Sequence, residues 1–285
     1  MKHVDIRYDQ SNENYHKKEF EPTGLHTYFS SSQLKVAAHS LLAFQHSLMG
    51  WTPGISTQAL KFGNRHHDIR EAGGFEEWKH RAEVVPAELE RKDGSLRSCK
   101  EVREFYDTFQ NKEILTRSEY EKHKQMDEML MANHAARRLE EDAESREVSI
   151  RIREEGMKFG SKARYDMRTK GGILVDYKTT SEPDPRNTFH KAVRKYNYGL
   201  SSVLYTDVCR FAGIEVSEMH FVVSSTVAPE YETQVIVLSQ DYLEYCRHEL
   251  GNTKDLISYT WDKLCSGDFI EPEGYGLVHE MEIFH

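Results

Sequence analysis

Two predicted strands joined by a Gly-Gly turn, residues 160–180, constrain the fold of this chain more than any other stretch. The sequence GSKARYDMRTKGGILVDYKTT places Asp166 on the first strand, and Asp176 and Lys178 on the second. Side chains alternate across a strand, so Asp176 and Lys178 project from the same face. The apolar run at residues 173–175 indicates a buried strand, where a charged pair is costly unless it serves a purpose.

An acid followed on the next strand by an acid-x-lysine sequence is the arrangement of a metal-dependent site that cleaves phosphodiesters. A divalent cation needs hard oxygen ligands, which Asp166 and Asp176 supply. Lys178 is suited to hold or deprotonate the attacking water and to neutralise charge that develops on the phosphate. The alternative is a surface ion pair on an edge strand, because an acid-x-lysine sequence is common by chance.

The segment before these strands extends the pattern. The sequence EVSIRIR, residues 147–153, alternates and predicts a third strand. Short connections join the three strands, at residues 147–153, 160–167 and 173–178, so we expect an antiparallel meander. Glu147 opens the first strand and is either a third carboxylate at the metal or a charged strand end.

Capping and periodicity signals predict helices on both sides of the meander. Ser30 with Gln33, and Ser118 with Glu121, fit the capping-box pattern. Helices are predicted over residues 30–48, 59–72, 118–144, 188–195, 199–212, 240–250 and 254–265. The remaining predicted elements are an irregular arm at 1–28, short elements at 73–117, and strands at 219–226 and 233–238.

Two adjacent histidines, His66 and His67, lie in the predicted helix at residues 59–72. Neighbours on a helix point about 100° apart, so the two rings cannot both face one site. A lone histidine is more often a structural or surface residue than a ligand, so the spacing alone does not assign either ring to a metal.

The charge of the chain is distributed unevenly. A formal net charge of −9 argues against a protein that coats nucleic acid. Residues 151–195 hold twelve Lys and Arg against six Asp and Glu, a local charge of +6 that leaves −15 for the rest. Positive charge therefore surrounds the candidate site, where phosphates would approach. Solvated strand faces that happen to be basic are the alternative.

Basic and aromatic side chains follow the meander. Lys191, Arg194 and Lys195 are suited to contact phosphates, and Tyr196 and Tyr198 to stack on bases or on the end of a duplex. Packing of amphipathic tyrosines explains the two aromatic residues at least as well.

Cysteine usage and hydropathy narrow the protein class. No C-x-x-C spacing occurs among the four cysteines, so neither a disulfide framework nor a zinc knuckle is expected. The first residues are polar, and no apolar run reaches membrane-spanning length. We therefore expect a soluble cytoplasmic protein with reduced thiols and no membrane partner.

The order of elements resembles the core of the PD-(D/E)XK nuclease superfamily, and more closely the exonuclease VIII family of the RecE type. Four features carry the resemblance: the helix opener SSSQLK; FGNRHH, which matches an FGxxxH motif with His67 as its histidine; EVSIRIR followed by GSKARYD and ILVDYKTT; and KYNYGLSSVLYTD, which matches a tyrosine-rich helix. The match spans residues 30–207, with a looser fit beyond.

The resemblance implies a restriction-endonuclease-like α/β fold, with a mixed central sheet flanked by helices. It makes residues 29–285 a single nuclease domain, mainly helical over 29–145 and holding the catalytic core and C-terminal helices over 146–285. It assigns Asp166, Asp176 and Glu147, joined by His67, to metal binding, and Lys178 to catalysis. Tyr205 fits the last tyrosine of the helical motif, whereas the family's glutamine falls on Ser201, a shorter side chain.

The resemblance also implies an activity. The expected protein is a Mg²⁺-dependent exonuclease, with Mn²⁺ as a substitute, that degrades linear double-stranded DNA from 5′ to 3′. It would leave single-stranded 3′ tails for recombination, form a tetrameric ring and work with a single-strand annealing protein. The cysteine pattern of relatives with iron–sulfur clusters is absent, so no cluster is expected. The alternatives are an endonuclease of the same fold and an inactive DNA-end-binding recombination scaffold.

Overall fold

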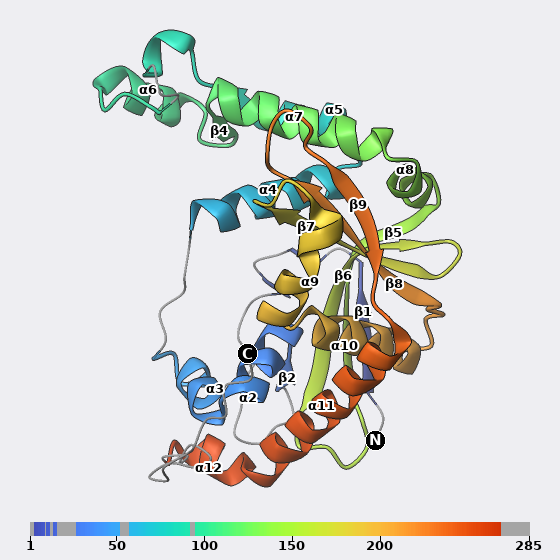
Figure 1. The fold of residues 1–285 in the computed structure, drawn as a ribbon. Coiled ribbons are helices and arrows are strands. Elements are labelled where there is room, and N and C mark those ends of the chain that lie inside the picture. The colour runs from blue at the N-terminus through green and yellow to red at the C-terminus, as the bar shows by residue number, and fades with distance from the viewer. Residues whose placement is uncertain are drawn as a thin grey trace, which may run out of the picture.

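The fold is mixed α/β, with a central sheet flanked by helices, as expected for a restriction-endonuclease-like core (Figure 1). The structure is a computed structural model, and it describes residues 3–8, 10–11, 14–15, 27–51, 57–91 and 95–268. Within these residues, no helix is both long and apolar enough to cross a membrane.

The main sheet has the strand order β1-β5-β6-β7-β8-β9, and the short strand β2 pairs with β6. The strands are β1 (His3–Arg7), β2 (Tyr28–Phe29), β5 (Ala143–Arg153), β6 (Gly160–Thr169), β7 (Ile173–Thr180), β8 (Glu218–Ser225) and β9 (Thr233–Val237). β5, β6 and β7 pair antiparallel, which confirms the predicted meander, and β7 pairs parallel with β8.

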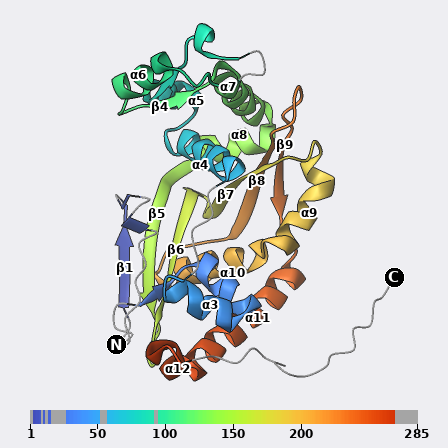
Figure 2. The same cartoon turned by 90° about the vertical axis from the view of Figure 1, so that its left-hand side faces the viewer.

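Helices cover both faces of the sheet (Figures 1 and 2). One face carries α2 (Ser31–His39), α3 (Leu41–Leu48), α9 (Pro185–Lys195), α10 (Tyr198–Phe211), α11 (Gln240–Tyr259) and α12 (Trp261–Ser266). The other carries α7 (Arg117–Ala132) and α8 (His134–Glu141). Strand alternation sorts the core accordingly: Leu174 packs under the first group, and Val175 and Tyr177 under the second.

The remaining elements pack around α7 or extend the molecule at that end (Figure 2). They are α4 (Gln58–Glu71), α5 (Phe75–Trp78), two 3-10 turns (Lys79–Arg81 and Ala87–Leu89), α6 (Lys100–Thr108), and the paired strands β3 (Ala82–Val84) and β4 (Glu113–Leu115). Helix α4 was predicted over residues 59–72, and the others are the short elements expected over residues 73–117. Of these elements, α4 reaches back to the main sheet and contacts β7.

Two helix boundaries in the N-terminal half differ from prediction. The capping box at Ser30 and Gln33 is present, but the helix stops at Ser40, whose extended backbone ends α2 and whose hydroxyl caps α3. The capping box of α7 is formed by Thr116 and Glu119, so the prediction at Ser118 was wrong by two residues.

Other predicted boundaries were also wrong for identifiable reasons. Asn133 caps a new helix and divides the predicted long helix into α7 and α8. Gly251 lies within α11, which runs unbroken to Tyr259 because its buried side chains continue at helical spacing. The predicted arm at residues 1–28 includes strand β1, which pairs with the edge of β5.

Candidate functional site

Glu147, Asp166 and Asp176 lie side by side across β5, β6 and β7. The residues before and after Glu147 pair with those after and before Asp166, so these two acids are opposite each other. The register of β6 and β7, continued by one residue from its last pair, sets Asp166 opposite Asp176. Like charges directly opposite in a sheet are destabilising, so this row is best accommodated by a cation.

Glu147 was predicted to open a strand, but it lies inside β5. Its backbone is left-handed (φ 54°). This conformation costs a residue other than glycine about 1–2 kcal/mol. The strand changes the side it presents at this point: Arg146 contacts Tyr177 on the α8 side, whereas Val148 packs in the core under α10. Backbone strain of this kind is characteristic of functional sites.

The carboxylate of Asp166 fills a fork between two strands. β6 and β7 pair only through two residue pairs next to their turn and then separate. Beyond the last pair, the backbone N–H of Tyr177 donates to Oδ2 of Asp166 at 2.8 Å, so a side chain replaces the next ladder hydrogen bond. The fork opens the sheet where the acids lie.

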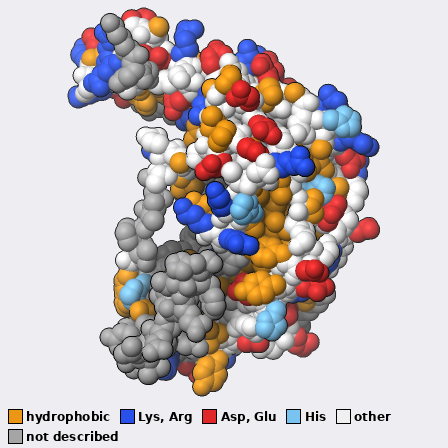
Figure 3. Space-filling model, viewed as in Figure 1, with side chains coloured by type: hydrophobic (Ala, Val, Ile, Leu, Met, Phe, Trp, Pro, Cys, Tyr) orange, Lys and Arg blue, Asp and Glu red, His pale blue; other side chains and the backbone are white. Residues whose placement is uncertain are grey.

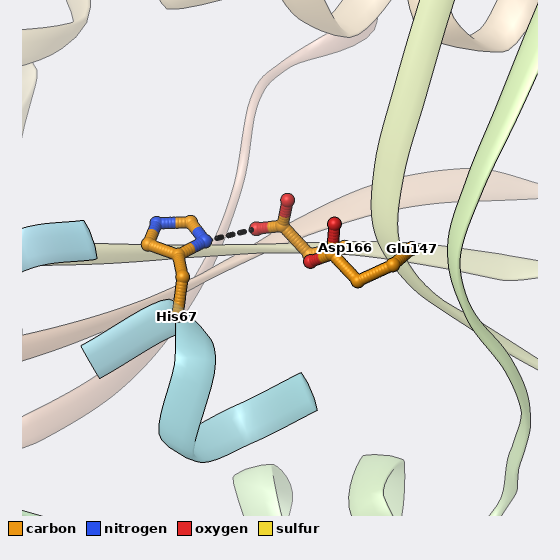
Figure 4. Close-up of side chains that lie close together, drawn as sticks. All are labelled: His67, Glu147 and Asp166. Carbon is orange, nitrogen blue, oxygen red and sulfur yellow. Dashed lines mark ion pairs between the residues drawn. The ribbon is translucent and has the colours of Figure 1, made fainter. Parts of the chain in front are cut away.

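His67 reaches this fork from α4 (Figure 4). Its Nδ1 lies 3.1 Å from Oδ2 of Asp166, and ligand atoms of His67, Glu147 and Asp166 all lie within 4.8 Å of one another. One imidazole nitrogen and two carboxylates form a donor set that suits a divalent cation. His66 points elsewhere and is fully buried, as expected for adjacent helical residues.

The close approach of the acidic side chains shifts the pKa values of the groups in the site. Burial and the neighbouring Asp166 raise the pKa of Glu147 to about 7, against the effect of Arg164, which donates to Glu147 at 2.5 Å. Burial would raise the pKa of Asp166 too, but His67 and other donors hold it below its usual value. The pKa of His67 is raised, because Asp166 outweighs the burial of the ring.

Asp176 and Lys178 form an ion pair on the α10 side of β7, as their spacing predicts. Burial opposes the charge on Lys178, but Asp176 and Asp166 outweigh it and raise the lysine pKa. Burial and Asp166 raise the pKa of Asp176. Lys178 Nζ also lies 5.3 Å from the centre of the Tyr198 ring. The lysine is thus held, fully charged, beside the row of acids.

A second lysine at this position was not predicted. Lys35 of α2 lies 5.4 Å from the centre of the same Tyr198 ring, and none of the residues that the structure covers forms an ion pair with it. Burial, with Lys178, lowers its pKa to about 8. The only sequence signal was its place in the helix opener SSSQLK, because nothing local connects Lys35 to a strand 140 residues later.

Two clefts meet at Tyr196 and Tyr198, next to Lys178. The first, of 470 Å³, lies between α4, α7 and the end of β7, and its basic side chains are Lys61, Arg65 and Lys122. The second, of 620 Å³, lies between α2 and α9, and its basic side chains are Lys35, His39, Arg194 and Lys195. Figure 3 shows Lys and Arg side chains gathered near the middle of this hollowed face.

The structure separates the residues predicted to contact DNA. Arg194, Lys195 and Tyr196 are exposed, and they line the clefts. Lys191 is exposed on α9 but lines neither cleft. Tyr205 is partly buried against the core, where it interacts with Ser31, and it lines neither cleft. Ser201, at the position of the family's glutamine, is buried in α10.

Comparisons with known proteins agree with this architecture. The family model described as "PDDEXK-like domain of unknown function (DUF3799)" matches residues 30–263. A crystal structure from Eubacterium rectale, of a protein named "Putative exonuclease", superimposes with a TM-score of 0.59 at 15% identity, covering 97% of this chain and 96% of that one. At this identity the likeness concerns the fold alone. No curated protein matches the sequence significantly.

Proposed function

Because the chain belongs to the family of PDDEXK-like domains of unknown function, we propose that it is a metal-dependent nuclease that hydrolyses DNA phosphodiesters. The row formed by Glu147, Asp166 and Asp176, with Lys178 two residues further along β7, carries this proposal. An inactive scaffold would have no need for adjacent acids that repel one another, nor for the left-handed backbone at Glu147.

The residues at the fork would hold Mg²⁺, or Mn²⁺ in its place. His67, Glu147 and Asp166 offer converging donor atoms, and Asp176 adjoins them once its carboxylate is released from Lys178. When bound, such an ion supplies Lewis-acid activation of the phosphate and of a water. The resemblance to the exonuclease VIII family supports the same set.

Lys178 is the protein side chain that we assign to the chemical step. Its ammonium group is buried beside Asp176 and Asp166, with its pKa raised, so it stays protonated at neutral pH. A protonated lysine is a hydrogen-bond donor that orients the attacking water or neutralises charge on the scissile phosphate.

The two clefts would guide a strand of DNA past Lys178. Tyr196 is half exposed where they meet, and Lys195 Nζ lies 5.2 Å from the centre of its ring. Lysines and arginines along both clefts suit the phosphate backbone, and an exposed aromatic ring suits stacking on a base. This arrangement favours a nucleic acid over a small phosphodiester as substrate.

The finer proposal is an exonuclease that acts on ends of linear double-stranded DNA, from 5′ to 3′. It rests on the exonuclease VIII resemblance and on the name of the structural neighbour. The test is digestion of linear duplexes labelled separately at the 5′ or 3′ end, with Mg²⁺ or with a chelator, and with a closed circle as control. Release of the 5′ label first, from linear DNA only and only with metal, is the expected result.

The alternative outcomes identify the competing functions. Cleavage of the closed circle would identify an endonuclease of the same fold. Metal-independent binding to DNA ends, without cleavage in Mg²⁺ or Mn²⁺, would identify a scaffold protein.

A further inference from the structure

Behind the row of acids lies a buried ionic cluster, made of Arg70, Asp127, Glu140, Arg146 and Tyr177. Glu140 of α8 is its centre: it accepts hydrogen bonds from Arg70 (3.1 Å), Arg146 (2.6 Å) and the hydroxyl of Tyr177 (2.7 Å). Arg70 also forms an ion pair with Asp127 of α7. Two arginines and two carboxylates balance, so the cluster is a neutral, hydrogen-bonded unit.

Three of the four elements that carry His67 and the acids, α4, β5 and β7, also carry a member of this cluster, whereas β6 carries Asp166 alone. Arg70 follows His67 by one turn of α4, and Arg146 precedes Glu147 on β5. Tyr177 lies between Asp176 and Lys178, and it faces the opposite side of β7. The cluster therefore links α4, β5 and β7, the elements that carry His67, Glu147 and Asp176.

Tyr177 connects the cluster to the site most directly. Its hydroxyl binds Glu140, whereas its backbone N–H donates to Asp166 at 2.8 Å. Its ring meets the ring of His67 edge to face, with centroids 6.3 Å apart. A shift of this one side chain would displace the partner of Asp166 and the support of His67 together.

The sheet alone cannot fix the spacing of the acids. β6 and β7 separate beyond their second residue pair, so no ladder of backbone hydrogen bonds holds β7 against β6 at the fork. β5 and β7 are not neighbours in the sheet, but Arg146 and Tyr177 tie them together through Glu140, and Arg146 also donates to the Tyr177 hydroxyl at 3.3 Å. Repulsion among the acids acts to widen the fork, and the cluster resists it.

We propose that Tyr177, Glu140, Arg146 and Arg70 form a positioning cluster that holds His67 and the three acids ready to bind a divalent cation. The inference rests on the proposed metal site, but it concerns metal affinity and not cleavage. Residues that orient metal ligands in this way typically change affinity by about 10–100-fold when they are altered.

The test is calorimetric titration of the full chain with Mn²⁺ alone, for wild type, Tyr177→Phe and a matched control, Tyr165→Phe. Tyr165 has nearly the same burial and precedes Asp166, and its hydroxyl is likewise hydrogen-bonded to a side chain, that of Ser145, at 2.9 Å. Both variants thus lose a buried tyrosine hydroxyl, but only the hydroxyl of Tyr177 contacts the cluster.

We expect Tyr177→Phe to weaken Mn²⁺ binding about tenfold or more, and Tyr165→Phe to stay within about twofold of wild type. Should Tyr177→Phe not fold, Arg146→Lys serves instead, since it keeps the charge but cannot reach both Glu140 and Tyr177. Equal affinities for all folded variants would overturn the positioning role alone. A wild-type chain that binds no Mn²⁺ would overturn the metal site itself, and a chain that binds Mn²⁺ but cleaves no DNA would overturn only the proposed nuclease activity.

Discussion

The backbone N–H of Tyr177 donates its hydrogen bond to the carboxylate of Asp166, at 2.8 Å, where the next residue of β6 would otherwise have paired. One contact thereby ends the pairing of two strands and orients an acid at the candidate metal site. The opening between β6 and β7 is therefore part of the candidate site. It is held by this bond at the Tyr177 backbone and by Glu140 at the Tyr177 hydroxyl.

Lys178 and Asp176 are expected to differ in what their loss impairs. Lys178→Ala should still bind Mg²⁺ and DNA ends but cleave about 10²–10³-fold more slowly, because it loses one donor directed at the developing charge. Asp176→Asn should instead weaken metal binding, because it removes the negative charge that a hard cation requires. Single-turnover cleavage and metal titration of each variant separate the two effects. Cleavage by Lys178→Ala at the wild-type rate would remove this lysine from the mechanism.

The two adjacent histidines are expected to fail in different ways. His67→Ala should lower metal affinity about tenfold or more, because His67 contacts Asp166 at the site. His66→Ala should leave metal affinity unchanged but lower the free energy of unfolding by about 2–4 kcal/mol, since its ring is fully buried and leaves a cavity. Metal titration and urea denaturation of both variants test this. Equal behaviour of the two variants would show that the FGxxxH match has no functional meaning here.

His123 should make the fold sensitive to acid. Burial, with Arg65 and Lys122 adding to it, lowers the pKa of this ring to about 3, and neither ring nitrogen has a partner among the described residues. An unfolded histidine has a pKa near its usual value of about 6.5, so below that pH the unfolded state binds the extra proton. The free energy of unfolding should fall by about 1.4 kcal/mol per pH unit from this residue.

The matching variant is His123→Phe, which keeps an aromatic ring stacked on Phe62. When the pH is lowered from about 7.5 to about 5, wild type should lose about 2 kcal/mol more of its free energy of unfolding than this variant does. Urea denaturation at the two pH values measures this difference, in which the contribution of His66 cancels. Parallel pH profiles of the two proteins would contradict the prediction.

Tyr196 should contribute to DNA binding through stacking. Tyr196→Ala is expected to weaken binding of a duplex end by about 1–3 kcal/mol, which is the range for one base stacked on an aromatic ring. Fluorescence anisotropy with Ca²⁺ in place of Mg²⁺ measures binding without efficient cleavage. Tyr106→Ala is the control, because Tyr106 is similarly exposed but lies on α6 and lines neither cleft. Equal affinity for the two variants would place the DNA elsewhere.

The part of the site that local sequence determines was predictable. A Gly-Gly turn between two alternating segments indicates a hairpin, and Gly172 adopts the positive φ (81°) that such a turn requires. The hairpin alone places Asp176 and Lys178 on one face and brings Asp166 to the neighbouring strand. The resemblance to the PD-(D/E)XK superfamily could be predicted for the same reason, because its motifs lie within these short segments.

What depended on contacts distant in sequence was not predictable. Glu147 is a poor candidate for a left-handed backbone, and no turn residue beside it indicates one. Both Thr116 and Ser118 begin a capping-box pattern, and the fold uses the first, directly after the fully buried Leu115. Lys35 and Glu140 reach the site from helices, so no spacing along the chain relates them to β7.

Strand β1 also governs how the molecule should be handled. The family match begins at residue 30, so a shortened protein starting there would lack β1 and leave β5 unpaired along Ser149–Arg153. A free sheet edge with apolar residues such as Ile150 and Ile152 is a template for strand addition by a second copy. Self-association seen in such a shortened protein would arise from trimming, so the oligomeric state has to be measured with the first residues in place.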